Sequence, residues 1–309
     1  MTEGDRVVAE FPGTRLVTDC PTYEPEAREG EEVQRRRAVD VHAIAERPEE
    51  ADPTWTLTQL LASPTIASKR WVHRQYDTMV RTNTVIGPGG DAAVVRLRGT
   101  DRAVALKTDC NGRWCYLDPR TGAQAAVAEA ARNVACAGGR PMAITNNLNF
   151  GNPKRPEVYF QLREAVRGMG EACRALNTPV TGGNVSLYNE NPNGAIHPTP
   201  VVGMVGLVES LAHVTPAGFC EAGDAIVLLG ECTDELGGSE YLARLHDTVA
   251  GTPPRVDLDA EKRLIDALLA AIAAGDVRSA HDCSDGGLAV ALAECCMADL
   301  DAARGAEVD

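Results

Sequence analysis

The chain has 309 residues, of which 44% are hydrophobic and 24% charged, and its formal net charge is −14. This composition is typical of a globular protein of one or two domains. The acidic balance disfavours nucleic acid as a partner, because a negative field repels phosphate backbones. No apolar stretch reaches the ~20 residues that a membrane span needs. The ten cysteines lack metal-ligand spacing, so we expect reduced thiols and a cytoplasmic location.

The first 53 residues do not have the pattern of a domain start. Residues 6–11 alternate like a short strand, and a long segment rich in Glu, Arg and Pro follows. Such a segment cannot bury enough apolar surface to fold alone. We therefore expect residues 1–53 to be the tail of a preceding domain together with a linker.

Residues 54–212 have the pattern of a compact α/β domain that opens with a short helix at Pro53. Strands are expected at residues 92–97, 104–108, 141–145, 180 and 201–208, and helices at 122–138 and 156–176. The residues expected to face inward from the two helices are Ala125, Ala128, Ala131 and Val134, and then Phe160, Val166, Met169 and Cys173.

Residues 213–309 begin a second α/β unit. A strand is expected at residues 225–230, and helices begin after Gly238 and near residues 259 and 288. The last five residues have the pattern of a strand start, so we expect both ends of the chain to be cut. The fold class is therefore α/β (α+β), with a sheet domain and packed helices followed by a partial C-terminal α/β domain.

A nucleotide site of a common type is excluded by the residues. Neither G-x-x-x-x-G-K-[ST] nor G-x-G-x-x-G occurs, which rules out a P-loop or a Rossmann site. Bound ATP would need acidic and amide side chains together with Mg²⁺. Such side chains follow expected strands or glycines at Asp91, at Asp109 and Asn111, and at residues 146–152. Each could be an ordinary turn, but several in one domain favour a ligand site at strand ends.

The stretch 181–189 is the sharpest candidate for such a site. Gly182 and Gly183 would let the backbone press against a ligand. Asn184 offers an amide oxygen to Mg²⁺, and the Ser186 hydroxyl can reach a phosphate. A turn between two strands, without any ligand, is the alternative interpretation.

The pair His281-Asp282 leaves two interpretations open. It is compatible with a metal-dependent phosphohydrolase or with an oriented general base. The alternative is a glycine loop whose following helix presents free N–H groups to an anion. The sequence does not choose a role for either residue.

Several blocks, in order along the chain, resemble the large synthetase component of phosphoribosylformylglycinamidine synthase. This family belongs to the superfamily of ATP-dependent aminoimidazole ribotide synthetases, and the similarity is to its small bacterial and archaeal form. The blocks lie at residues 69–77, 88–94, 117–119, 128–133, 148–153, 183–189 and 198–203.

The resemblance implies an organisation of two repeats, each with an N-terminal and a C-terminal α/β domain. This chain is similar to the second repeat, with 1–53 as the end of the preceding C-terminal domain. Residues 54–212 would be the ATP and substrate domain, and 213–309 a truncated C-terminal domain. The family's catalytic histidine lies in the first repeat, so the resemblance implies no catalytic residue in this chain.

The resemblance also implies the chemistry. The family converts formylglycinamide ribotide to the amidine with ATP, Mg²⁺ and glutamine-derived ammonia, in the cytoplasm and as part of purine biosynthesis. Its partners are a glutaminase subunit and a small accessory subunit. ATP phosphorylates the amide oxygen and ammonia then displaces phosphate, which requires charge neutralisation and alignment.

By the same resemblance, Gly183 approaches ATP, Asn184 ligates Mg²⁺ and Ser186 contacts the substrate. Asn146 occupies a position where the family has an ATP-contacting aspartate, which removes one negative charge. A pseudo-symmetric auxiliary nucleotide site is implied for Asp91, Asp109 and Asn111.

Two rival functions are weighed against this one. A selenophosphate synthetase or a thiamine phosphate kinase of the same superfamily would carry a catalytic Cys or Lys near the start of a repeat, which this sequence lacks. A binding or scaffolding half without turnover is the non-enzymatic alternative. We expect the isolated 309 residues to be inactive.

Overall fold

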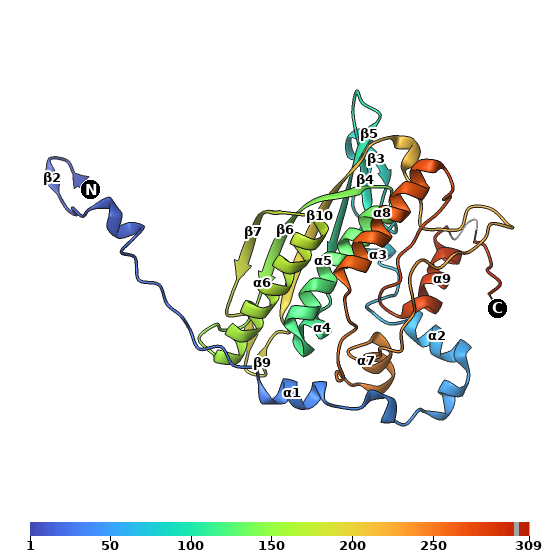
Figure 1. Ribbon diagram of the computed structural model, residues 1–309, viewed down its shortest axis with the longest axis horizontal. Coiled ribbons are helices and arrows are strands. Elements are labelled where there is room, and N and C mark those ends of the chain that lie inside the picture. Colours follow the sequence, from blue (N-terminus) through green and yellow to red (C-terminus); the bar gives the residue numbers. More distant parts are fainter. Residues whose placement is uncertain (300–302, 309) are drawn as a thin grey trace.

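A six-stranded mixed sheet forms the centre of the chain in the computed structural model, which describes residues 1–299 and 303–308 (Figure 1). The strand order is β3-β4-β5-β10-β6-β7. Neighbouring strands are antiparallel except β6 and β7, which are parallel. The strands are β3 (Thr84–Ile86), β4 (Ala93–Leu97), β5 (Arg102–Asp109), β6 (Arg140–Asn149), β7 (Val180–Ser186) and β10 (Thr199–Val208).

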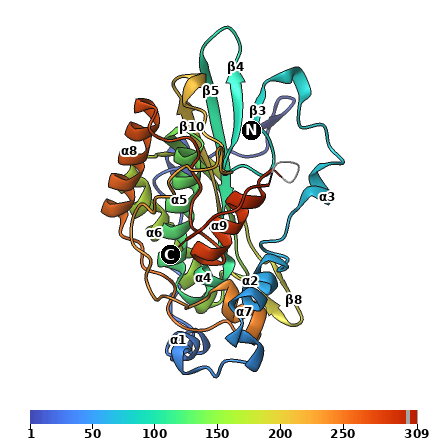
Figure 2. The same cartoon turned by 90° about the vertical axis from the view of Figure 1, so that its right-hand side faces the viewer.

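Three long helices cover one face of this sheet: α5 (Pro119–Cys136), α6 (Pro156–Leu176) and α8 (Leu258–Ala274) (Figures 1 and 2). Helix α6 is the crossover connection that the parallel strands β6 and β7 require. Asp118 caps α5 by accepting hydrogen bonds from the backbone N–H groups of Arg120 and Thr121. The two helices approach closely because Gly168 of α6 has no Cβ atom, which would overlap the Arg120 carbonyl.

The core lies between these helices and the sheet. Alternate strand residues such as Ala105, Ile144 and Val202 are fully buried and point toward the helices. The opposite face of the sheet is not covered by α5, α6 or α8. Leu106, for example, points to that face and is 45% exposed.

Shorter elements surround one end of the sheet. Arg113 on α4 pairs with Glu240 on α7, and Ser63, just after α2, bonds to the same carboxylate. The helices are α1 (Glu31–Arg37), α2 (Pro53–Leu61), α3 (Arg70–His73), α4 (Gly112–Leu117), α7 (Glu240–His246) and α9 (Gly287–Met297). The two small hairpins are β1 (Thr2–Glu3) with β2 (Arg6–Val7), and β8 (Glu190–Asn191) with β9 (Gly194–Ala195). Single 3-10 turns are formed by Gly13–Leu16, Val41–Ala43, Pro48–Ala51, Val80–Thr82 and Leu211–His213.

The α/β fold class and most of the expected elements are confirmed. The four residues expected to face inward from α5 are all buried, and so are Met169 and Cys173 on α6. Val166 is an error, since it is 49% exposed. Helix α6 packs through its Gly and Ala residues, and Val166 lies outside that narrow contact.

Four local expectations are wrong in whole or in part. Residues 225–230 form no strand, and Val227 is 71% exposed because the segment has no pairing partner among the described residues. The Gly182-Gly183-Asn184 stretch lies in edge strand β7 and is not a turn. Asn146, Asn147 and Asn149 lie within β6, because β10 and β7 pair with it on both sides, and only Asn152 follows the strand. Only Arg6–Val7 of the expected N-terminal strand is extended.

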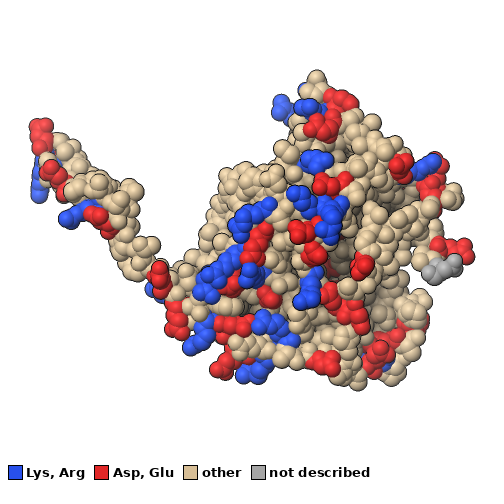
Figure 3. Space-filling model, in the orientation of Figure 1, with Lys and Arg blue, Asp and Glu red and all other residues tan. Residues whose placement is uncertain are grey.

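The surface carries intermixed acidic and basic side chains over the helical face (Figure 3). Pairs such as Arg120 with Glu171 on neighbouring helices account for part of this pattern. The N-terminal residues extend away from the body of the chain until Arg28, which bonds to Glu157 at the start of α6 (Figure 1). None of the described helices is long and apolar enough to cross a membrane.

Candidate functional site

Edge strand β7 places its glycines against β6 without unusual backbone angles, since neither Gly182 nor Gly183 has a positive φ. Gly183 is required for a different reason. A Cβ atom there would overlap Oδ1 of Asn146 and lie 2.9 Å from its carbonyl oxygen. At Gly182 a Cβ atom would meet nothing within 4 Å. Close approach therefore restricts position 183 alone.

The candidate residues on β6 and β7 divide between the two faces of the sheet. The amide of Asn184 donates to Oδ1 of its neighbour Asn147 at 3.2 Å, on the uncovered face. Ser186, two residues further along β7, lies on this same face. Asn146 points the other way, with its amide 3.3 Å from the sulfur of Met169 on α6. The structure thus brings Asn184 and Ser186 together and separates the Asn146 side chain from them.

One row of residues crosses the sheet through the remaining candidates. Asp109 of β5 pairs with Val202 of β10, which also pairs with Asn146 of β6, which in turn pairs with Gly183 of β7. Neighbouring strands lie about 4.8 Å apart, so Asp109 and Asn146 are separated by roughly two strand spacings. Candidates that are distant in the sequence are therefore neighbours on the helix-facing side.

An acidic cluster of buried and half-buried carboxylates lies at the β5 end of this row. Its carboxylates are Asp91 before β4, Asp109, Glu129 on α5, and Asp282 and Asp285 before α9. Burial and the neighbouring carboxylates raise the pKa of Asp109 to about 7, against the opposing effect of Lys107. Burial likewise raises the pKa of Glu129, Asp282 and Asp285. A cluster of this kind favours a bound cation or protons.

Two cations partly neutralise the cluster. Arg132 on α5 contacts Glu261 on α8 at 2.7 Å and Asp282 at 3.6 Å. Lys107 on β5 donates to the amide oxygen of Asn133 at 3.0 Å. One carboxylate oxygen of Asp282 still has no hydrogen-bond partner, and the same holds for one oxygen of Asp91.

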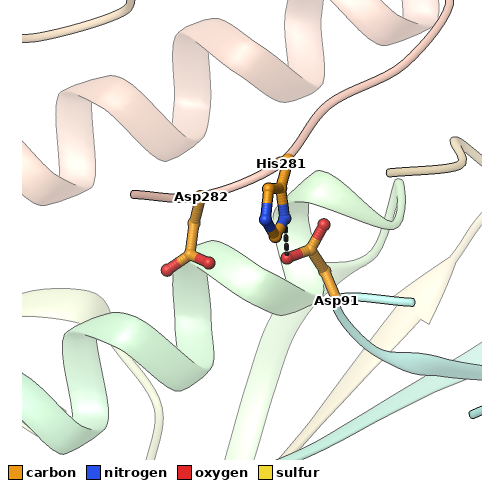
Figure 4. Close-up of side chains that lie close together, drawn as sticks. All are labelled: Asp91, His281 and Asp282. Carbon is orange, nitrogen blue, oxygen red and sulfur yellow. Dashed lines mark hydrogen bonds and ion pairs between the residues drawn. The ribbon is translucent and has the colours of Figure 1, made fainter. Parts of the chain in front are cut away.

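His281 is held between the carboxylates of Asp91 and Glu294, and Figure 4 shows its contact with Asp91. Its Nδ1 lies 2.8 Å from Asp91 and its Nε2 lies 3.1 Å from Glu294 on α9. Burial lowers the pKa of His281, but these two bonds outweigh burial and raise it to about 10. Both ring nitrogens therefore carry protons at neutral pH, which leaves no lone pair for a general base.

A cation could be held by atoms from Asp91, His281 and Asp282, which lie within 4.8 Å of one another. The charged imidazole would have to lose a proton to take part. The oxygens of the two aspartates that lack a hydrogen bond suit a hard cation better than the histidine does, although that of Asp282 already faces Arg132 at 3.6 Å.

Asn111 connects the acidic cluster with the start of helix α4. Its side-chain oxygen caps α4 by accepting from the N–H groups of Arg113 and Trp114. Its amide donates to Asp285 at 3.1 Å. The structure therefore gives Asn111 two structural bonds and places it beside the cluster.

Glu129 and Asp285 of this cluster, and Glu294 beside His281, were not predicted from the sequence. Glu129 lies in one of the blocks that carry the family resemblance, which was a usable signal. Nothing local distinguishes Glu294 from any other acidic residue of a helix, since its role arises from the contact with His281.

Two family models match the chain in order. Residues 89–208 match the N-terminal domain of AIR synthase related proteins, and residues 221–308 match the C-terminal domain. Together the two models span more than half of the chain. The chain therefore belongs to the AIR synthase related proteins.

The particular relatives are synthase subunits of one kind. The chain is 54% identical over 303 residues to phosphoribosylformylglycinamidine synthase subunit PurL of Alkaliphilus metalliredigens, covering 98% of the chain and 41% of the relative. The same subunit of Moorella thermoacetica is 54% identical over 307 residues, with 99% and 41% covered. The chain thus spans about two fifths of these curated relatives, and the resemblance expected from the motifs is confirmed.

Solved structures of the same subunit are also similar to the chain. The structure of PurLQS from Thermotoga maritima is 38% identical, with 48% of this chain and 25% of that chain covered and a TM-score of 0.45. T. maritima PurL complexed with ATP is 36% identical, with 48% and 24% covered and a TM-score of 0.44.

Proposed function

We propose that this chain supplies one part of a composite site that converts formylglycinamide ribotide to formylglycinamidine ribotide with ATP and glutamine-derived ammonia. The sequence identity to PurL subunits is the single observation that carries this proposal. The reaction belongs to purine biosynthesis, and we propose a cytoplasmic location for it.

We assign the domains of the chain accordingly. Residues 1–53 are the tail of a preceding C-terminal-type domain with a linker. Residues 54–212 are the ATP and substrate domain, and residues 213–309 are part of a C-terminal-type domain. The preceding repeat of the same subunit would complete the site against the uncovered face of the sheet, where Asn184 and Ser186 lie. The glutaminase and small accessory subunits are the further partners.

Each candidate residue has a role in this proposal. The backbone of Gly183 approaches ATP, with Asn146 behind it, and Ser186 contacts the ribotide. Asn184 would ligate Mg²⁺, and its amide oxygen is free for this because only its nitrogen is used by Asn147. Mg²⁺, when bound, would neutralise the charge that develops on the phosphates.

A second nucleotide position is proposed at the acidic cluster. Asp91, Asp109 and Asn111 would contribute to it, together with Asp282. The Asp91 oxygen that has no hydrogen-bond partner and the raised pKa of Asp109 support a cation at this position. Phosphates could approach these carboxylates only with a cation between them.

The direct test is a titration of the chain with Mg-ATP. Asn184→Ala should weaken binding roughly tenfold or more, as expected for the loss of a metal ligand. Asn193→Ala, in the exposed β8–β9 hairpin, is the matched control and should leave binding unchanged. Equal affinity of wild type and Asn184→Ala would remove Asn184 from the metal site.

The alternative is that these 309 residues only bind and do not turn over. Edge strand β7 favours this alternative of an incomplete site, because each residue from Val180 to Val185 is exposed. We expect no ribotide-dependent ATP hydrolysis by the chain alone and restored hydrolysis when a first-repeat polypeptide of a PurL relative is added. Hydrolysis by the chain alone would contradict the composite site.

A further inference from the structure

The end of edge strand β7 is closed by a side chain that the proposed function does not use. Asn189 follows Tyr188, whose backbone has a positive φ of 62° and so turns the chain back toward β6. The backbone N–H and the side-chain amide of Asn189 both donate to the carbonyl oxygen of Phe150, each at 3.1 Å. Asn189 therefore fixes the position of the β7 end against the end of β6.

The same amide fixes the hydroxyl of Ser186. Nδ2 of Asn189 lies 2.9 Å from the Ser186 carbonyl oxygen and 3.1 Å from the Ser186 Oγ. An amide nitrogen can only donate, so Oγ is the acceptor in this contact, and it shares the two N–H protons with the carbonyl oxygens of Phe150 and Ser186. Among the described residues, the hydroxyl proton has one acceptor within reach, Oδ1 of Asn189 at 3.3 Å, which is long for an O–H···O bond.

This geometry gives the hydroxyl a direction. With its lone pair engaged by Asn189, Ser186 can turn its proton toward a stronger acceptor than the amide oxygen. Oxygens of a phosphate monoester are such acceptors. Ser186 is half-buried on the uncovered face of the sheet, the side from which such a phosphate would approach.

We propose that Asn189 is a positioning residue that makes the Ser186 hydroxyl a hydrogen-bond donor to the phosphate of the ribotide. This inference rests on the proposed function, since it takes Ser186 as a substrate contact. It adds a residue that does not touch the substrate and whose effect passes through Ser186.

Asn189→Asp tests the polarity directly because it keeps the shape of the side chain. A carboxylate only accepts, so it would take the Ser186 proton and present the oxygen's lone pairs to the phosphate. Formylglycinamide ribotide should then bind roughly tenfold to hundredfold more weakly to the chain combined with a first-repeat polypeptide. Asn191→Asp adds the same charge nearby and keeps the acceptor for the Asn193 N–H, so its affinity should match wild type.

A double-mutant cycle separates positioning from a general effect on the fold. In a Ser186→Ala background, Asn189→Asp should cause no further loss of affinity. An equal loss in both backgrounds would overturn the inference, and so would unchanged affinity in the single variant; both results leave the proposed function standing. Absence of ribotide binding by the wild-type combination would instead remove the substrate role of Ser186, and the inference with it.

A measurement without ligand examines the positioning itself. The side-chain amide protons of Asn189 should exchange slowly with solvent, and their NMR shifts should change in Ser186→Ala. Exchange as fast as that of the exposed Asn193 amide would also overturn the inference.

Discussion

The side chain of Asn146 occupies the space that a Cβ atom of Gly183 would need. The two residues are partners in the parallel pair of β6 and β7, on the side that faces α6. This contact explains the second glycine of the pair by packing and not by backbone angle. It also keeps Asn146 beside the backbone that we propose to approach ATP.

Gly183→Ala should therefore destabilise the fold by about 1–3 kcal/mol, because the methyl group displaces Asn146. Gly182→Ala is the matched control and should change stability by less than about 0.5 kcal/mol, since its Cβ atom would point into open space. Urea unfolding of both variants measures the difference. Equal stability of the two variants would contradict the packing role of Gly183.

Arg132 should be among the most sensitive positions of the chain. It joins α5 to α8 through Glu261 and also contacts Asp282, and its side chain is only 20% exposed. Arg132→Ala would leave two acidic groups without their cation, so we expect a loss of about 3–5 kcal/mol.

Arg140 provides the control for this variant. It pairs with Asp266 at 3.1 Å, but both side chains are more than half exposed. Arg140→Ala should cost no more than about 1 kcal/mol. Denaturant unfolding of both variants at one pH makes the comparison. Similar losses of unfolding free energy in the two variants would mean that burial does not strengthen the Arg132 ion pairs.

Asp109 is expected to lower the stability of the metal-free chain at neutral pH. Its pKa in the folded chain is about 7, against an ordinary value of 3.8. A raised carboxyl pKa favours folding at low pH, and this advantage disappears as pH rises from about 4 to 7. Asp109→Asn should therefore stabilise the chain at pH 8, by about 1–3 kcal/mol.

If the cluster holds a cation, Mg²⁺ should reverse the difference in stability between the wild type and Asp109→Asn. Millimolar Mg²⁺ should raise the melting temperature of the wild type more than that of Asp109→Asn. Asp276→Asn, at an exposed position, removes the same charge and should behave like the wild type. A destabilised Asp109→Asn variant without metal would show that the carboxylate is a structural requirement.

His281 should also make stability fall as pH rises, but over a higher range of pH and from a stabilising contribution at neutral pH. Its folded-state pKa of about 10 lies above the ordinary 6.5, so its contribution to stability is complete below about 6.5 and is lost as pH rises toward 10. Wild type should lose about 2 kcal/mol or more between pH 7 and 10 relative to His281→Gln. Unfolding in the presence of a chelator gives both curves. Parallel curves would mean that His281 is neutral in the folded chain.

The helices could be predicted from the sequence because their signals are local. The cap at Asp118 and the spacing of Ala125, Ala128 and Ala131 are contained within α5 itself. The segment 225–230 shows the limit of such signals. Its apolar run has strand propensity, yet a strand also needs a neighbour to pair with, and none is present among the described residues.

The candidate site was only partly predictable. Asp109, Asn146 and Gly183 were chosen from separate motifs, and the sequence contained no sign that they share one row across the sheet. Their alignment depends on the register of β10 against both β5 and β6. The two-residue period of a strand indicates which residues share a face, but it contains no information on register.

The sequence by itself determined the class of fold, the order of the elements and the family, because periodicity, capping residues and motif order are properties of short segments. Only the tertiary structure decided that Asn184 and Ser186 share the uncovered face while Asn146 points into the helical layer. It also decided the charge of His281, whose contact with Asp91 joins residues 190 positions apart. Such a contact depends on how the whole chain packs, and no local pattern records it.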